Sequence, residues 1–164
     1  MQFEVGDKVV YPTHGIGVIE GVLVRRMGGQ EIHFYQLRLA ETKSVVMVPT
    51  QNTEVVGIRR IVSPPEAQEL LFHLQKPCHE LDVVQREWKS RFKENTEKMK
   101  TGLLGDVVDV LKVLSTINNQ KSLSFREKKM YDRARRLVVS EIAAVEDTPE
   151  EQVEARIDGI LLQA

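Results

Sequence analysis

The stretch "IGVIEGVLVRRMGGQEIHFYQLRLA", residues 16–40, predicts two long strands joined by a tight turn. β-Branched residues alternate with polar ones on both sides of "MGGQ" (27–30), where two glycines allow positive φ at little steric cost. Gly21 lies inside the first of these strands, and a glycine within a strand indicates a bulge or a tight bend. The stretch therefore predicts a bent antiparallel hairpin.

Shorter strands flank this hairpin on both sides. "DKVVYP" (7–12) and "SVVMVP" (44–49) each predict a strand that is ended by its proline. "TEVVGIRRI" (53–61) is interpreted as a fifth strand. Short strands separated by tight turns within residues 1–62 are typical of a small antiparallel barrel, so we expect a Tudor-like (SH3-like) N-terminal domain.

The pattern becomes helical near residue 63. Apolar residues then recur three and four positions apart, and Ser or Thr followed three residues later by Glu predicts capped helix starts. Five helices are expected. The first begins at Ser63 and ends before Pro77, the second covers 85–100 and stops at Gly102, and the third covers about 105–118. The fourth runs from Ser124 to about Val145, and the fifth begins at Thr148 with Pro149 at its first position. The sequence thus predicts an α+β protein of two domains, the β barrel over 1–62 and an all-α five-helix domain over 63–164.

Composition and charge restrict the class of protein. Of the 164 residues, 41% are hydrophobic and 29% are charged, with a formal net charge of −1, which excludes a disordered chain. Cys78 is the single cysteine, so an intrachain disulfide is impossible. No apolar run reaches the roughly 20 residues of a membrane span, and the N-terminal residues do not resemble a signal peptide. We therefore expect a cytoplasmic protein without membrane contact.

No motif for catalysis, nucleotide binding or metal binding is complete. "GIGVIEG" (15–21) is one residue away from a dinucleotide fingerprint, and a strand follows it where a helix is required. The four histidines do not stand at the spacings of a metal site, so we expect neither a metal nor a cofactor, and no enzymatic activity. An enzyme that uses Cys78 and His79 remains an alternative, and it predicts that Cys78→Ala abolishes a measurable turnover.

Charge is unevenly distributed in the helical half. Residues 86–100 hold six Lys/Arg against three Glu, and residues 121–136 hold seven Lys/Arg against two acids. Residues 141–158 hold seven Asp/Glu against one Arg. Basic clusters on helices indicate contact with phosphates, although a solvated helical face is an equally simple interpretation of charge alone.

Trp88 is the single tryptophan, and Lys89, Arg91 and Lys93 surround it. One continuous helix would bury Trp88 in an apolar stripe, with the cations at its edge. That stripe consists of Leu81, Val84, Trp88, Phe92, Asn95 and Met99. If the helix instead begins near residues 82–86, Trp88 lies in its first turns and points outward. Beside cations, this arrangement is typical of proteins that insert a large side chain into distorted DNA.

Several motifs together resemble the CarD/CdnL-type bacterial transcription regulators, which bind RNA polymerase. These are "GDKVVYPTHGIGVIEGV", "YQLRLA", "VMVP", "VGIRRI", "EWKSRFKEN", "KMKTG" and "LSFREKKMYDRARRLVVSEIA". They follow one another in the family's order over nearly the whole chain. The N-terminal motifs also resemble the polymerase-binding module of the transcription-repair coupling factor, but the motor motifs of that helicase are absent from this sequence.

The resemblance implies that the Tudor-like domain binds the β subunit of RNA polymerase through a sheet edge. In this mode, β-augmentation, main-chain hydrogen bonds provide affinity and side chains provide selectivity. Arg25, Leu37, Met47 and Pro49 fall at the family's polymerase-contact positions. Some relatives have arginine in place of Met47, so an apolar contact would replace a salt bridge there. For Leu37 and Pro49, packing within the barrel and termination of a strand stay open as alternatives.

The resemblance also implies that the helical domain acts on promoter DNA at the upstream edge of the opened minus-ten element. The tryptophan that aligns with Trp88 is a wedge at the upstream fork of the transcription bubble, and Arg91 and Lys93 match basic positions that contact the DNA backbone. Ser90 stands where many relatives have a basic residue, and Lys89 would partly replace it. The expected DNA contacts are therefore Trp88, Lys89, Arg91 and Lys93.

The function that follows is transcription regulation by a protein, expected to be monomeric, that stabilises the open promoter complex. A few cations give weak, salt-sensitive DNA affinity without sequence readout, so polymerase would have to deliver the protein to promoters. The alternative is a free-standing helical DNA-binding module that acts without polymerase. Tight binding of duplex DNA by the helical domain alone would favour that alternative.

Overall fold

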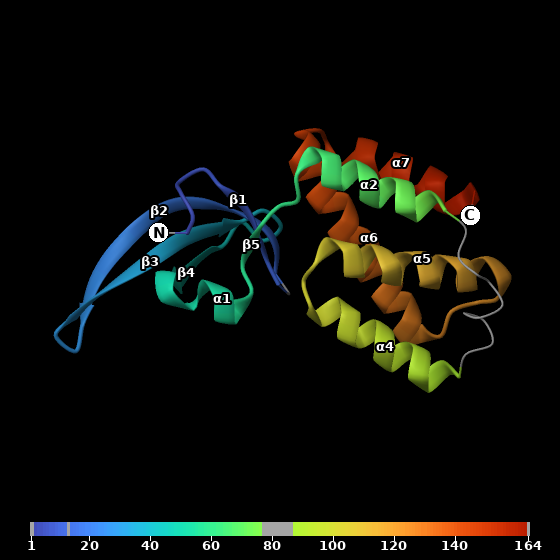
Figure 1. The fold of residues 1–164 in the computed structure, drawn as a ribbon, viewed down its shortest axis with the longest axis horizontal. Coiled ribbons are helices and arrows are strands. Elements are labelled where there is room, and N and C mark those ends of the chain that lie inside the picture. The colour runs from blue at the N-terminus through green and yellow to red at the C-terminus, as the bar shows by residue number, and fades with distance from the viewer. Residues whose placement is uncertain (1, 13, 77–86, 164) are drawn as a thin grey trace. The chain divides into compact units, whose positions relative to one another are not determined.

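The protein is described by a computed structural model that covers residues 2–12, 14–76 and 87–163 (Figure 1). The chain separates into two compact units, Met1–Ile61 and Val62–Ala164. The first unit is built mainly from strands and the second from helices, as Figure 1 shows. The predicted α+β class is confirmed.

The N-terminal unit is a five-stranded sheet with the order β4-β3-β2-β1-β5. Its strands are β1 (Lys8–Tyr11), β2 (Gly15–Met27), β3 (Gln30–Leu39), β4 (Val45–Pro49) and β5 (Arg59–Arg60). All neighbouring strands are antiparallel, in agreement with the predicted Tudor-like class. β4 and β5 lie at the two edges of the sheet.

The long hairpin β2–β3 has both features that its glycines predict. Gly28 and Gly29 have φ values of 59° and 80°, which lets the chain reverse between the two strands. The pairing shifts register between Ile19 and Gly21, and this shift is the predicted bulge. The local turn chemistry therefore determines the position of the hairpin.

The predicted fifth strand is only partly present. Thr53–Val56 forms a helical turn, α1, after a 3₁₀ helix, and only Arg59–Arg60 forms a strand. Thr53 is buried, and its hydroxyl donates to Gln2 Oε1 at 2.8 Å, which ties the start of the turn to the N-terminal segment. Gly57 takes a left-handed φ of 82° and its N–H donates to the carbonyl of Thr53. This helix-ending geometry leaves only two residues for the strand.

The core of the N-terminal unit is formed by alternate positions of the strands. Its almost fully buried members include Val9, Ile19, Tyr35, Leu37 and Val48. Tyr35 keeps its polar end satisfied because its hydroxyl accepts a hydrogen bond from the N–H of Phe3 at 3.0 Å. The two rings also pack edge to face, with centroids 5.6 Å apart. The side chain of Tyr35 thus holds the N-terminal segment against the sheet.

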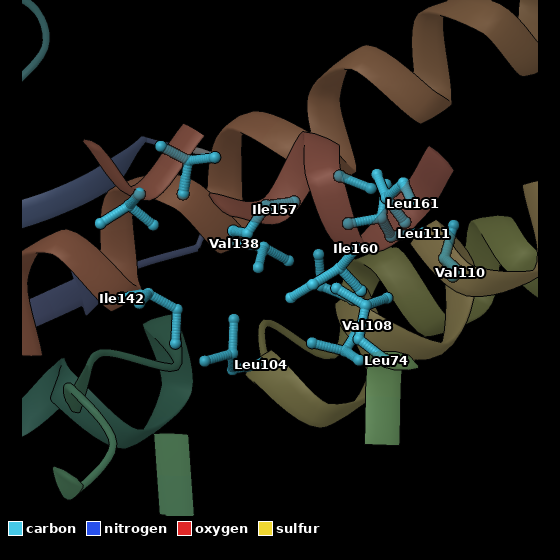
Figure 2. Packing of buried hydrophobic residues seen from close by; sticks show 14 of the residues in the cluster. Leu74, Leu104, Val108, Val110, Leu111, Val138, Ile142, Ile157, Ile160 and Leu161 are labelled. Carbon is cyan, nitrogen blue, oxygen red and sulfur yellow. The ribbon is translucent and has the colours of Figure 1, made fainter. Parts of the chain in front are cut away.

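Five helices of the C-terminal unit are described. They are α2 (Pro64–Gln75), α4 (Trp88–Lys100), α5 (Leu104–Gln120), α6 (Phe125–Glu146) and α7 (Glu150–Gln163). Figure 2 shows apolar side chains from α2, α5, α6 and α7 converging in one core, among them Leu74, Leu111, Val138 and Ile157. α4 contributes less to this core, since only its Met99 packs against it. No described helix has the combined length and apolar character needed to cross a bilayer.

Two of the three predicted helix caps are confirmed. Ser63 Oγ accepts from the N–H of Glu66 at the start of α2, and Ser124 Oγ accepts from the N–H of Glu127 at the start of α6. The predicted cap at Thr148 is wrong, because α7 begins at Glu150 and the Thr148 hydroxyl has no hydrogen-bond partner among the described residues.

The cause of the missing cap lies at the end of α6. Asp147 takes a left-handed conformation, and the N–H of Thr148 donates to the carbonyl of Ala143. Thr148 therefore belongs to the C-terminal cap of α6.

Candidate nucleic-acid interface

Trp88 is the first residue of α4, and its indole is only partly buried. The ring stacks on Phe92 one turn later, with centroids 5.4 Å apart and an interplanar angle of 11°. Its Nε1–H donates to Ser124 Oγ at 3.2 Å. The indole is thus held at a helix start by one ring and one hydrogen bond, with part of its surface open to solvent.

The two sequence interpretations of Trp88 each describe part of this geometry. Asn95 is buried and Met99 packs on the core, as the predicted apolar stripe requires. Trp88 and Phe92, which lie in the first turns of α4, are only partly buried. The stripe's first members, at positions 81 and 84, lie outside the described residues.

Ser124 connects the starts of α4 and α6. Its hydroxyl oxygen accepts from the N–H of Glu127 as the N-cap of α6, and it accepts from the indole of Trp88. A serine hydroxyl has two acceptor positions and one proton, and the proton faces Glu127 Oε1 at 3.4 Å. All the hydrogen-bonding capacity of Ser124 therefore serves to hold Trp88 and the cap together.

Arg91 does not lie where a phosphate contact requires it. Its guanidinium is buried with Glu127, at side-chain exposures of 4% and 2%. Two parallel hydrogen bonds join the pair, from Nε to Oε2 at 2.9 Å and from Nη2 to Oε1 at 3.0 Å. The expectation that Arg91 contacts DNA is corrected: its position faces α6, and its charge is used to hold α4 against the start of that helix.

Exposed cations surround the aromatic residues instead. Lys89 and Lys93, two of the expected DNA contacts, are exposed on α4. The guanidinium of Arg126 lies over the ring of Phe92 at 5.2 Å, and Lys129 Nζ lies over the ring of Phe125 at 4.7 Å. α4 and α6 therefore present one aromatic surface with cations at its rim.

Sequence reasoning did not identify Phe125 and Arg126 as members of this surface. Phe125 is 73% exposed, although it is a large apolar residue. The relevant pattern was present, since Phe125 directly follows a capping serine and lies among Arg126, Lys128 and Lys129. That pattern is similar to the cations around Trp88, but the two clusters are joined by tertiary contacts, the Trp88–Ser124 hydrogen bond and the Arg126–Phe92 contact among them.

Not every cation of the basic stretch 121–136 is available. Arg135 binds Asp158 through both Nε and Nη2, each at 2.7 Å, and Glu154 through Nη2 at 2.8 Å. Hydrogen bonds to these two carboxylates raise the pKa of Arg135 above its usual range. Arg135 therefore joins α6 to α7 and adds little positive field outside the protein.

The predicted polymerase-contact residues of the sheet fall into two groups. Met47 and Pro49 are half-buried on edge strand β4, opposite Gln36 and Phe34 of β3. Leu37 is fully buried in the sheet core, so a direct contact of its side chain with a partner is ruled out in this fold. Packing, the alternative left open for Leu37, is what the structure shows.

Arg25 lies on the outer part of the β2–β3 hairpin. This part has only two strands, because β1 pairs with residues 15–18 of β2 and β4 pairs with residues 34–38 of β3. Arg25 is exposed there, and so are Leu23 and Val24. The exposed surface of the sheet thus combines a free edge with a two-stranded extension that carries both charge and apolar side chains.

No group of three or more His, Cys, Asp and Glu in the described part of the chain is arranged to hold a metal ion. The predicted alternative site at positions 78 and 79 lies outside the described residues. Nothing in the described geometry therefore adds to the enzyme alternative.

Comparisons with known proteins match two family models to separate parts of the chain. Residues 71–158 match the family model for the CarD C-terminal domain, and residues 3–62 match that for the CarD-like/TRCF RID domain. YdeB of Bacillus subtilis (strain 168), whose name gives it as a candidate transcription factor, is 29% identical over 153 residues, which are 93% of this chain and 98% of YdeB. A solution NMR structure of the 72-residue N-terminal domain of Myxococcus xanthus CarD is 37% identical, with a TM-score of 0.31, and the match covers 36% of this chain and 79% of that one. The chain thus belongs to the CarD/CdnL family, and it is a transcription regulator.

Proposed function

We propose that this regulator binds the β subunit of RNA polymerase through its N-terminal sheet and stabilises the open promoter complex with Trp88 as a wedge. The wedge would lie at the upstream fork of the bubble, near the upstream edge of the minus-ten element. The observation that carries the proposal is the geometry of Trp88: a half-exposed indole, fixed by Phe92 and Ser124, with exposed cations beside it.

The fixed indole is suited to favour an opened bubble over closed duplex. A base that has lost its neighbour can stack on an aromatic ring, and such contacts contribute about 1–3 kcal/mol per base. A ligand shifts an equilibrium only by its differential affinity for the two states. A wedge that contacts only the open form would therefore raise the open population by about 5- to 150-fold. The stack and hydrogen bond that hold Trp88 reduce the entropy lost when it docks.

The engagement of two arginines in ion pairs supports delivery by polymerase over the free-standing DNA-binding alternative. Lys89 and Lys93 remain as proposed backbone contacts, together with Arg126 at the rim of the aromatic surface. Arg91 and Arg135 are engaged with carboxylates inside the protein. So few phosphate contacts give weak, salt-sensitive and sequence-independent affinity, which tethering to polymerase would compensate.

The sheet supports the polymerase-binding part of the proposal. β4 is an edge strand, and an edge strand presents main-chain N–H and C=O groups that a partner strand can pair with. Met47 and Pro49 lie on this strand and Arg25 lies on the hairpin extension. Leu37 would act from beneath, by packing the strand next to β4 into the core.

The test is the lifetime of the open complex formed by polymerase on a promoter, measured after addition of a competitor. Trp88→Ala is expected to shorten this lifetime by about 5-fold or more, the lower end of base–aromatic stacking. Met47→Asp is expected to weaken binding to polymerase alone, while Trp88→Ala leaves that binding intact. A Trp88→Ala protein that sustains the wild-type lifetime, with normal polymerase affinity, would refute the wedge.

A further inference from the structure

Phe125 is an exposed aromatic residue with no role in the core of the C-terminal unit. It is the first residue of α6 and is 73% exposed. Its chain neighbour Ser124 binds the indole of Trp88 at 3.2 Å. Phe125 therefore follows directly in the chain the residue that binds the proposed wedge.

We infer that Phe125 is a second aromatic contact of this site, which stacks on an unpaired base of the opened DNA while Arg126 and Lys129 bind the flanking phosphates. The inference rests on the proposed function and deepens it, because it names single-stranded DNA at the bubble edge as the ligand of α6. In this arrangement Trp88 occupies the fork, and Phe125 contacts the strand that leads away from it.

The composition of the surface matches a site for single-stranded nucleic acid. Such sites combine aromatic rings that stack on bases with cations that bind the backbone between them. Lys129 Nζ lies over the Phe125 ring at 4.7 Å, and Arg126 lies over the Phe92 ring at 5.2 Å. Both cations thus lie at the aromatic surface, where they could bind the backbone of a strand whose base stacks on Phe125.

The charge around Phe125 favours DNA as the occupant over a protein surface. Residues 121–129 contain four Lys/Arg and one acidic residue, Glu127. The carboxylate of Glu127 is buried against Arg91, so it does not offset the positive field at the surface. An apolar ring among exposed cations is complementary to a base with its phosphates.

The chemistry of the ring also defines the form of DNA. A phenyl ring has no hydrogen-bond donor or acceptor, so it cannot read base edges and stacks on any base. Bases within a duplex have both faces covered by neighbours, so a stacking contact requires an unpaired base. The contact at Phe125 is therefore expected to depend on opening and to tolerate sequence changes.

The chain provides a matched control at Phe72 on α2. Phe72 is 61% exposed and has Lys76 Nζ over its ring at 5.0 Å, the same arrangement of Phe and Lys four residues apart. With the full chain, polymerase and a promoter, Phe125→Ala is expected to shorten the open-complex lifetime by about 5-fold or more, and Phe72→Ala to leave it unchanged. Phe125→Trp should restore the lifetime and Phe125→Leu should not, because only an aromatic face stacks.

A fluorescent base identifies the contact directly. With 2-aminopurine at unpaired positions near the upstream edge of the bubble, wild-type protein is expected to quench the probe at one position where Phe125→Ala does not. Wild-type helical circular dichroism and melting of Phe125→Ala would show that the fold is intact, and Phe125→Leu serves as a second test if it is not.

The outcomes separate this inference from the function on which it rests. A lifetime shortened by Trp88→Ala but unaffected by Phe125→Ala would overturn the role of Phe125 and leave the wedge in place. No effect of either variant would overturn both. A loss of affinity for polymerase in the absence of DNA, caused by Phe125→Ala, would show a protein contact and would also overturn the inference.

Discussion

Removal of the Glu127 carboxylate is expected to destabilise the C-terminal unit more than any surface charge change. In Glu127→Ala, the guanidinium of Arg91 would lose its two hydrogen bonds to Glu127 while only 4% of its side chain is exposed. Breaking a buried ion pair from one side costs about 3–5 kcal/mol, because an uncompensated charge stays away from water. That loss is a large share of the roughly 5–15 kcal/mol of a typical domain.

The matched control is Glu146→Ala, at the other end of the same helix. Glu146 also forms a two-bond pair with an arginine, Arg156, at 2.7 and 2.8 Å. The side chains of this pair are 29% and 45% exposed, so its loss is expected to cost only about 0.2–1 kcal/mol. The two variants remove the same residue type from the same helix, and the pairs that they break differ in burial.

Urea unfolding followed by helical circular dichroism measures both effects. With a slope of about 1–3 kcal/mol per molar urea, the midpoint of Glu127→Ala should fall by at least about 1 M, and that of Glu146→Ala by much less. The fluorescence of Trp88 can follow the same unfolding transition, because the indole is held against Ser124 at the start of α6 in the folded protein.

A decrease of the urea midpoint in Glu127→Ala that is no larger than the decrease in Glu146→Ala would refute the role of the buried pair. A double variant makes the cause explicit. Arg91→Met combined with Glu127→Leu replaces the pair by apolar side chains, and such replacements of buried pairs are often neutral or stabilising. It is expected to regain most of the stability that Glu127→Ala loses, because it removes the buried guanidinium together with its carboxylate.

Two further expectations concern packing and pH. Gly17→Ala would place a Cβ 2.7 Å from Leu37 Cδ1 and should lower the free energy of unfolding by about 1–3 kcal/mol. In the control Gly159→Ala on α7, the new Cβ would have no atom within 4 Å. Equal urea midpoints for the two variants would contradict this expectation. Burial and the nearby Asp158 raise the pKa of Tyr131 above its ordinary value of about 10. The neutral phenol therefore stabilises the folded state fully below about pH 10, and this contribution is lost as the pH rises through the folded-state pKa. The titration of Tyr131 can be followed as the absorbance at 295 nm that wild type has and Tyr131→Phe lacks. Its midpoint should lie at a higher pH in the folded than in the urea-unfolded protein. An equal or lower midpoint in the folded protein would contradict the expectation.

Features set by a few neighbouring residues were predictable from the sequence. The turn at Gly28 and the bulge at Gly21 follow from the backbone freedom of glycine, and the caps at Ser63 and Ser124 follow from one hydroxyl and an N–H three residues later. Such interactions close within one turn of chain, so their residues are visible together in the sequence. The order of strands and helices rests on the same local information.

Features set by distant partners were not predictable. Thr53 begins a helical turn where a strand was expected, and it hydrogen-bonds a residue about fifty positions away. The missing cap at Thr148 reflects competition from the end of the preceding helix. Leu37 and Arg91 were expected at interfaces by alignment with relatives, and both are buried by partners that periodicity alone does not identify.

The orientation of the cations on α4 connects these observations to function. The buried face of α4 carries Arg91 and Asn95, which are four residues apart. Its exposed face carries Lys89 and Lys93, which are also four apart. One basic stretch of sequence is therefore divided between two faces of the helix. The inward arginine fixes the start of α6, and the serine that caps α6 fixes Trp88. Charge that would have strengthened DNA affinity is thus used to hold an aromatic side chain in place. Under the proposed function, the loss of Arg91 from the outer face of α4 would keep DNA affinity low, and the held indole would favour an opened bubble over a closed duplex. That combination is useful only if another molecule delivers the protein to the bubble, which is why the structure of α4 itself argues for a polymerase-bound regulator over a free-standing DNA-binding module.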